Sequence, residues 1–258
     1  MAIQKTPAIL LSKKEIRETS CIVHFYTEHF GKIKGLIKAV RGPQAVFGVY
    51  LHEFAEYDIV YYEKKRKDIY TVSECDLKAV YRQLSIDLTR RLWAYYLVEL
   101  VDKLTVLEDK NSDLYQLLSS TLRLLDSERF IDKVITVFQL QFLKTLGIMP
   151  QLEFCVNCGK KLSDFTGITF SVKSAGLLCN KCYGCDIQSF ATSKGAAASM
   201  TALAKTPLSN LARISISSKM REEISNLLNK FIDYQLGEHL KSARFIKAVT
   251  EDLCIFRT

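Results

Sequence analysis

The chain has 258 residues, of which 48% are hydrophobic and 25% are charged, so it can form an ordinary hydrophobic core. No apolar run approaches the roughly 18 residues of a membrane helix, and residues 1–7 show no signal-peptide pattern, which favours a cytoplasmic protein. The formal net charge is +8, and residues 1–41 hold eight Lys or Arg against three acidic residues. This excess favours a polyanionic partner, although a solvated basic surface would have the same composition.

Residues 1–80 contain short apolar runs with a period of two, which predicts β-strands. Five strands are expected, at about residues 2–11, 20–27, 32–40, 48–62 and 69–77. Five short strands with basic loops are typical of a small closed barrel of the OB type. Such barrels bind single-stranded nucleic acid with a positive groove and with aromatic side chains on which bases stack.

Basic residues gather at three places in this predicted barrel. Lys32, Lys34 and Lys38 lie on one face of the third strand, where they would line a groove that follows a phosphate backbone. A second cluster is expected in the turn after the first strand, and a third between the fourth and fifth strands. The candidate DNA-binding residues are Lys13, Lys14, Arg17, Lys32, Lys34, Lys38, Arg41, Lys64, Lys65, Arg66 and Lys67. One or two aromatic residues are expected against bases, and the others in the core: Phe25, Tyr26, Phe30, Phe47, Tyr50, Tyr61 and Tyr62.

Near residue 80 the apolar period changes to about 3.6, which predicts helices. Three are expected, at about residues 84–104, 112–125 and 130–146, and two more at 194–204 and from 217 onward. The predicted fold class is α+β, with an N-terminal OB-type barrel (1–80) and an α-helical domain (81–150 and 191–258). A four-cysteine zinc ribbon (151–190) interrupts the helical domain.

The zinc ribbon is predicted from two Cys-x2-Cys pairs that are twenty residues apart: Cys155, Cys158, Cys179 and Cys182. Four thiolates in a tetrahedron satisfy Zn²⁺ and leave no open position, so the expected role is structural. Free buried cysteines or disulfides are the alternatives, but eight cysteines without a signal peptide indicate a reducing compartment. Cys185 could compete with Cys182 as the fourth ligand. With Cys179 and Cys182 it also forms a Cys-x2-Cys-x2-Cys run, the start of a ferredoxin-type motif whose final Cys-Pro is missing.

No template for catalysis is present. The sequence lacks a phosphate-binding Gly-x4-Gly-Lys loop, a dinucleotide fingerprint and a Gly-x-Ser-x-Gly elbow. His24, His29, His52 and His239 are scattered, and the His-x-Glu half of a zinc deaminase motif is absent. We therefore expect a protein that is not an enzyme.

Six segments follow one another along nearly the whole chain: Ala8-Ile-Leu-Leu11, Glu18-Thr-Ser20, Phe25-Tyr-Thr27, Lys38-Ala-Val-Arg-Gly42, Leu146-Gly-Ile-Met-Pro150 and Leu240-Lys-Ser242. In this order, around the four cysteines, they resemble the RecO family of bacterial DNA-repair proteins. The chain departs from that family after the third strand. Many members have Gly-Ala-Arg-Lys there, whereas this chain has Val40-Arg41-Gly42-Pro43, with fewer basic residues to bind DNA.

The resemblance implies a recombination mediator without catalytic turnover, located in the bacterial cytoplasm at the nucleoid. Such proteins bind single- and double-stranded DNA, anneal complementary strands and act with RecR. They also engage the acidic C-terminal tail of single-strand-binding protein and help to load RecA. Two other functions remain open from the residues alone: an OB protein that binds RNA, and a structural adaptor whose basic face is only solvated.

Overall fold

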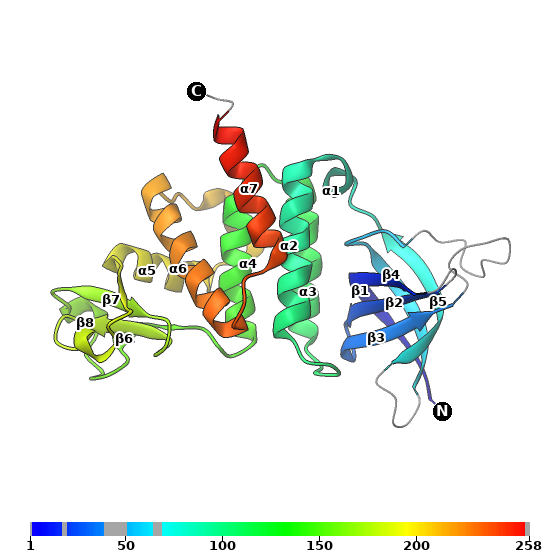
Figure 1. Cartoon of the computed structure of the whole chain (residues 1–258), viewed down its shortest axis with the longest axis horizontal. Coiled ribbons are helices and arrows are strands. Elements are labelled where there is room, and N and C mark those ends of the chain that lie inside the picture. Colours follow the sequence, from blue (N-terminus) through cyan, green and yellow to red (C-terminus); the bar gives the residue numbers. More distant parts are fainter. Residues whose placement is uncertain (1, 17–19, 39–50, 64–68, 256–258) are drawn as a thin grey trace. The chain divides into compact units, whose positions relative to one another are not determined.

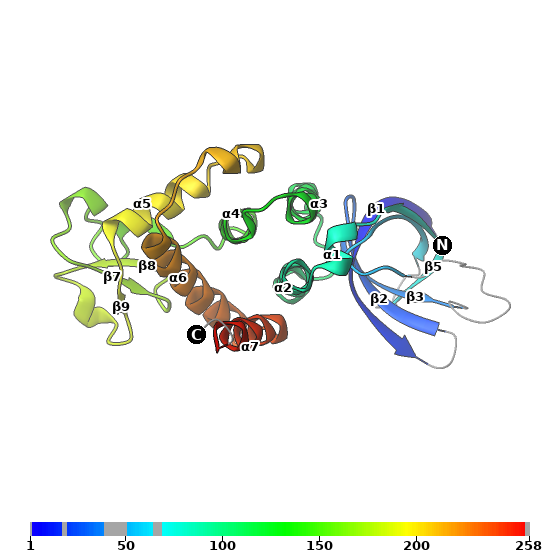
Figure 2. The ribbon, with the colours of Figure 1, turned by 90° about the horizontal axis from the view of Figure 1, so that it is seen from above.

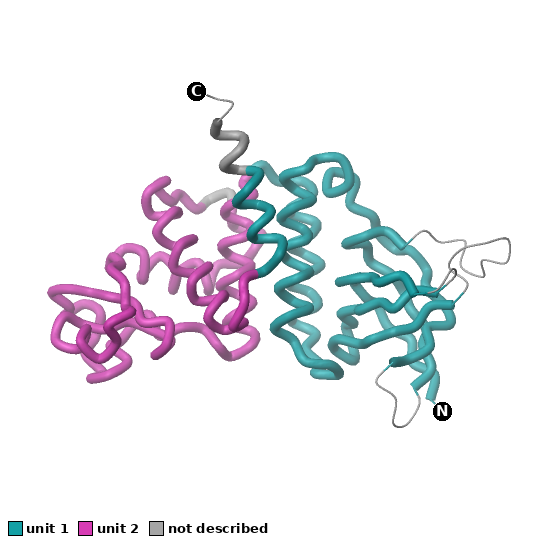
Figure 3. The backbone as a smooth tube through the Cα atoms, in the orientation of Figure 1, with its two compact units in different colours: residues 1–129, 240–258 teal, residues 130–239 magenta. Residues whose placement is uncertain are grey.

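The computed structural model describes residues 2–16, 20–38, 51–63 and 69–255, with the side chains of 212–213 and 250–255 left aside (Figure 1). The chain forms two compact units. Unit 1 contains residues 1–129 and 240–258, and unit 2 contains residues 130–239 (Figure 3). In the described part of the chain, no helix is both long and apolar enough to cross a bilayer.

The N-terminal part of unit 1 is a closed five-stranded barrel, as the sequence predicts. Its strands are β1 (Ala2–Ile16), β2 (Ser20–Thr27), β3 (Gly31–Ile37), β4 (Glu56–Glu63) and β5 (Tyr70–Ala79). The order around the barrel is β1-β2-β3-β5-β4, and β1 closes the ring because it is long enough to pair with both β2 and β4. β3 and β5 are parallel, and the other neighbours are antiparallel.

The barrel interior is filled by alternate side chains of these strands. Val23, Phe25 and Ile33 are fully buried there, and Phe25 packs edge-on against Tyr57 with ring centroids 6.0 Å apart. Burial of such side chains stabilises a fold by about 1.5–3 kcal/mol each. The period of two in the sequence therefore reflects a real inner and outer face.

The helices of unit 1 are α1 (Arg82–Ile86), α2 (Leu88–Leu104), α3 (Ser112–Ser127) and the C-terminal α7 (Lys241–Ile255). Figure 2 shows α2 and α3 side by side next to the barrel, and both contact β1. Asn111 begins α3 by accepting a hydrogen bond from the N–H of Leu114, as a helix N-cap does. α7 packs on α2.

Unit 2 combines helices with a small sheet. Its helices are α4 (Ile131–Thr145), α5 (Lys194–Leu203) and α6 (Ser218–Leu236), with a 3-10 helix η3 (Leu208–Arg213). Its sheet has the order β6-β8-β7-β9, with β6 (Gln151–Cys155), β7 (Ile168–Ser171), β8 (Gly176–Cys179) and β9 (Phe190–Ala191). Two 3-10 turns flank the strands, η1 (Leu162–Asp164) and η2 (Tyr183–Cys185). Phe170 of β7 packs edge-on against Phe231 of α6, which attaches the sheet to the helices.

Three predicted boundaries are wrong. β1 continues to Ile16, so Lys13 and Lys14 lie in a strand and not in the turn expected after residue 11. β4 begins at Glu56, because the described residues 51–55 form an irregular segment. The long helix expected over 84–104 is broken at Asp87, whose carboxylate accepts a hydrogen bond from the N–H of Arg90 and starts α2 afresh.

Candidate metal centre and nucleic-acid interface

The four predicted cysteines converge at one end of the small sheet in unit 2. Cys155 ends β6 and Cys179 ends β8, while Cys158 and Cys182 follow each of them after a tight turn. The backbone at Gly159 has a φ of +72°, which glycine adopts without strain and which brings the chain back after the first pair. The turns therefore direct both pairs of sulfurs to one point.

The sulfur positions fit a tetrahedral metal ion. All four Sγ atoms lie within 4.8 Å of one another, and the Sγ atoms of Cys158 and Cys179 are 3.8 Å apart. A tetrahedron with metal–sulfur bonds of about 2.3 Å has sulfurs about 3.8 Å apart. Cys185 is exposed at the end of η2 and is not one of this group, so Cys182 occupies the fourth position.

Polar hydrogens point at the sulfurs. The N–H of Cys179 donates to the Sγ of Cys155 at 3.5 Å, and the side-chain amide of Asn157 donates to the Sγ of Cys182 at 3.3 Å. Burial alone would raise the pKa of the Cys155 thiol, but the backbone N–H groups of Cys179, Cys158 and Asn157 lower it to about 6. Thiolates are the form that binds metals, so the site favours the ligand state of Cys155.

The second candidate site is the outer face of β1, β2 and β3. Residues directly opposite each other on paired strands share a face. Ser12 lies opposite His24, and His24 lies opposite Lys34. Lys14 and Lys32 belong to the same face, opposite Ile22 and Tyr26. We call the face that carries Ser12, Lys14, His24, Lys32 and Lys34 the outer face.

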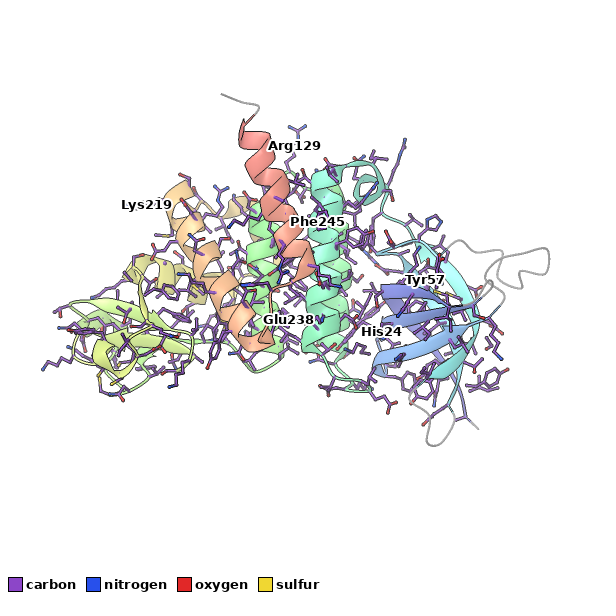
Figure 4. The ribbon with its side chains drawn as sticks, viewed as in Figure 1. His24, Tyr57, Arg129, Lys219, Glu238 and Phe245 are labelled. Carbon is purple, nitrogen blue, oxygen red and sulfur yellow. The ribbon has the colours of Figure 1, made fainter. Side chains whose placement is uncertain are left out.

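Part of the outer face is covered by α2. The Nδ1 of His24, a residue labelled in Figure 4, lies 2.9 Å from the Oδ1 of Asp102. Ser12 donates to the same carboxylate at 3.2 Å. Lys32 is 7% exposed, and its ammonium group donates to the backbone carbonyls of Asp102 and Thr105 at the end of α2. Lysine at a helix C-terminus satisfies carbonyls that have no partner within the helix. Lys32 is therefore already bound to α2, which removes it from the lysines that could contact phosphates.

The charges around Asp102 fix its protonation state. Burial by itself would raise the pKa of Asp102. The hydrogen bond and charge of His24 and the charge of Lys32 outweigh burial and hold that pKa below its usual range. Asp102 thus stays ionised and connects the barrel to α2.

A second buried carboxylate attaches the barrel to α3. Glu56 of β4 is 7% exposed and accepts hydrogen bonds from Tyr81, from Ser119 at 2.8 Å and from Arg123 at 3.1 Å. Burial would raise the pKa of Glu56, but these three donors lower it. Buried charges are tolerated when they are paired and hydrogen-bonded in this way.

The remaining described lysines of the predicted DNA site are accessible to different degrees. Lys14 and Lys38 are exposed, and Lys34 is half-buried. Lys13 is exposed but donates to the carbonyl of Leu51 at 2.9 Å. Six predicted residues lie outside the described part of the chain: Arg17, Arg41, Lys64, Lys65, Arg66 and Lys67.

Most described aromatic residues of the barrel cannot stack on bases. Phe25, Tyr26 and Tyr61 are buried, as expected for the majority. Phe30 and Tyr62 are half-buried, and Phe30 packs edge-on against Tyr61. Phe47 and Tyr50 lie outside the described residues.

Two family models match nearly the whole chain. The model described as "Recombination protein O N terminal" matches residues 1–81, and the model described as "Recombination protein O C terminal" matches residues 86–244. The chain belongs to the RecO family. The first match covers the barrel, and the second contains all four clustered cysteines.

Three curated RecO relatives match over 90% or more of their length. The DNA repair protein RecO of Desulfatibacillum aliphaticivorans is 32% identical over 94% of this chain and 95% of the relative. That of Caldicellulosiruptor bescii is 30% identical over 96% of this chain and 100% of the relative. That of Moorella thermoacetica is 28% identical over 95% of this chain and 90% of the relative. The chain is thus a RecO protein of DNA repair and recombination.

Sequence reasoning missed the residues that hold the RecO barrel in place. Asp102 and Glu56 gave no signal, because their importance depends on donors 78 and 63 residues away in the chain, at His24 and Ser119. One hint was available for Glu56, which is an acidic residue within an apolar, aromatic strand sequence.

Proposed function

We propose that this protein is a non-catalytic mediator of homologous recombination that binds single- and double-stranded DNA and anneals complementary strands. It helps to load RecA together with RecR and single-strand-binding protein, whose acidic C-terminal tail it engages. Family membership supports this role, and so does a closed barrel of the kind that binds single strands. A cytoplasmic location at the bacterial nucleoid follows from the same role.

The observation that carries the DNA-binding part of the proposal is the position of Lys14, Lys34 and Lys38. Lys14 and Lys34 lie on the outer face and Lys38 directly follows β3. Ammonium groups on β1 and β3, the two strands that flank β2, can bind successive phosphates of a strand that crosses the barrel. Arg41 and the basic residues 64–67 lie outside the described part of the chain and stay predicted members of the DNA site.

We also propose that the four cysteines hold a structural Zn²⁺. All four donors are soft sulfurs, which favours zinc over hard cations, and four protein ligands leave no position for a substrate. Bound zinc would neutralise the thiolates and fix the two turns that carry them. The metal would connect the turn after β6 with the turn after β8, so its loss should destabilise this part of unit 2.

Binding of a labelled single-stranded oligonucleotide at several salt concentrations tests the DNA-binding proposal. Three to five phosphate contacts predict that log Kd rises with log salt with a slope of about 2 to 3.5. Charge reversal at Lys34 and Lys38 together should reduce that slope by about 1.4. A salt-independent affinity would contradict the proposal, and a strong preference for structured RNA would favour the RNA-binding alternative. Retained protein binding without any nucleic-acid affinity would favour the adaptor.

A further inference from the structure

Unit 1 contains a cavity of about 450 Å³ beside the outer face. β1 and the segment 51–55 form one wall, α2 forms a second, and the first turns of α7 form the third. The lining is mainly apolar and includes Leu10, Leu11, Phe54, Leu92, Tyr95 and Phe245. A volume of this size lies in the range of ligand sites in proteins.

Two exposed aromatic side chains line this cavity. Tyr95 is 37% exposed and Phe245 is 66% exposed. Among the described residues of unit 1, they are the two Phe, Tyr or Trp residues that are exposed rather than buried or half-buried. Figure 4 shows Phe245 on α7. Tyr95 is held in place because it packs edge-on against Phe54, with ring centroids 4.7 Å apart.

The acidic residues of the cavity are already engaged. Glu99 accepts hydrogen bonds from the backbone N–H groups of Lys241 and Ser242 at 3.0 and 2.9 Å, which caps the start of α7. Glu53 accepts from the hydroxyl of Tyr95, and Asp102 is bound by His24 and Ser12. Each of these three carboxylates thus accepts a hydrogen bond from within the protein or pairs with His24.

Basic residues lie on two sides of the cavity. Lys13 and Lys241 are part of its lining, and both are exposed. Arg244 lies three residues after Lys241 on α7, which places the two cations on one side of the helix. Lys14 lies next to Lys13 on β1, on the outer face that carries Lys34. The positive charges thus run from the barrel lysines past the cavity to α7.

We propose that this cavity accepts an unpaired base of a single-stranded nucleic acid that crosses from the barrel lysines onto α7. Tyr95 and Phe245 supply the stacking surfaces, and Lys241 and Arg244 bind the phosphates that follow. Aromatic stacking platforms beside a positive groove are the means by which single strands are bound without sequence preference. This inference rests on the proposed DNA binding and adds to it a site for the base.

The test compares two strands and two proteins. A fluorescent oligo-dT and an abasic strand of the same length carry the same phosphates, but only the first has bases to stack. For oligo-dT, Phe245→Leu should raise Kd roughly 5- to 100-fold, as expected for the loss of one stacking contact. For the abasic strand, the same substitution should leave Kd unchanged. Phe245→Trp keeps a stacking surface and should keep the affinity for oligo-dT.

Controls separate this role from general effects. Tyr234→Leu removes an aromatic residue of α6 that is 51% exposed in unit 2, and it should change neither affinity. Thermal unfolding followed by circular dichroism shows whether the Phe245 variants fold. An equal effect of Phe245→Leu on both strands, or no effect on either, would overturn the proposal.

Two further outcomes distinguish what has failed. If the native protein binds neither strand at low salt, the proposed function itself is wrong. If it binds both with the expected salt dependence but Phe245→Leu matches the native protein, only the base site is wrong.

A peptide of alternating aspartate and phenylalanine provides the last comparison. If Phe245→Leu weakens binding of this peptide alone, the cavity binds acidic protein segments and the proposal is overturned.

Discussion

The ammonium nitrogen of Lys32 lies 2.6 Å from the carbonyl oxygen of Thr105, so a lysine of the barrel forms part of the C-terminal end of helix α2. The same nitrogen also donates to the carbonyl of Asp102. This contact separates Lys32 from Lys34 and Lys38, although all three appear equivalent in the sequence.

Replacement of Lys32 by methionine should therefore lower stability rather than DNA affinity. The buried carbonyl of Thr105 and the part-buried carbonyl of Asp102 would lose their donor, and a buried group left unsatisfied costs about 1–3 kcal/mol. Urea unfolding should show the lower free energy, while the salt slope of DNA binding stays within error of the native value. Lys38→Met is the matched control, with unchanged stability and a salt slope reduced by about 0.7. If Lys32→Met kept the native stability but reduced the salt slope, Lys32 would belong to the DNA site.

Glu56 should make the stability of the fold depend on pH. The folded-state pKa of Glu56 is below its ordinary value of 4.5, so its contribution is present above that value and is lost as pH falls through the folded pKa. Melting temperatures measured between pH 6 and pH 3 should fall less steeply for Glu56→Gln, which starts from a lower stability at pH 6. Glu74→Gln removes an exposed carboxylate of β5 and should retain the native pH dependence. Parallel curves for the native protein and Glu56→Gln would show that Glu56 does not carry this dependence.

Gly31 is required between β2 and β3 for two reasons. Its φ is +67°, and a Cβ atom there would lie 2.1 Å from the carbonyl oxygen of Asp109, which is a backbone atom that cannot easily move. Gly31→Ala should destabilise the protein by roughly 1–3 kcal/mol or more, measured by urea unfolding. Gly184→Ala, where a Cβ would meet open space, is the control and should remain close to native. If Gly31→Ala were as stable as the native protein, the segment around Asp109 would be free to shift.

The sequence predicted those features that depend on local pattern. The five strands follow from their period of two, and the four cysteines converge because each pair lies on one tight turn. Features that depend on distant partners were not visible. The strand pairing of Lys13 and Lys14 with Val23 and Ile22 extends β1 beyond its apolar run. In the same way, the alternation of β3 does not reveal that α2 covers one end of the outer face. The sequence therefore places Lys32 in one group with Lys34 and Lys38.

The metal proposal predicts one zinc ion per chain. Cys158→Ser should lose the metal and lower the melting temperature, because the two turns would no longer be fixed. Cys185→Ser should retain both the metal and the stability, since Cys185 is exposed and is not part of the sulfur cluster. Elemental analysis of the purified proteins, combined with thermal unfolding, checks both results. Loss of metal in Cys185→Ser but not in Cys158→Ser would contradict the assigned ligands.

The central claim, that the barrel and its lysines bring complementary strands together, is tested most directly by annealing. Two complementary oligonucleotides with a donor and an acceptor fluorophore are mixed with and without the metal-loaded protein over a series of salt concentrations. We expect faster annealing at low salt, a gradual loss of this effect as salt increases, and little acceleration by the Lys14→Glu, Lys34→Glu and Lys38→Glu triple variant. No acceleration at low salt by the folded native protein would contradict the proposed function.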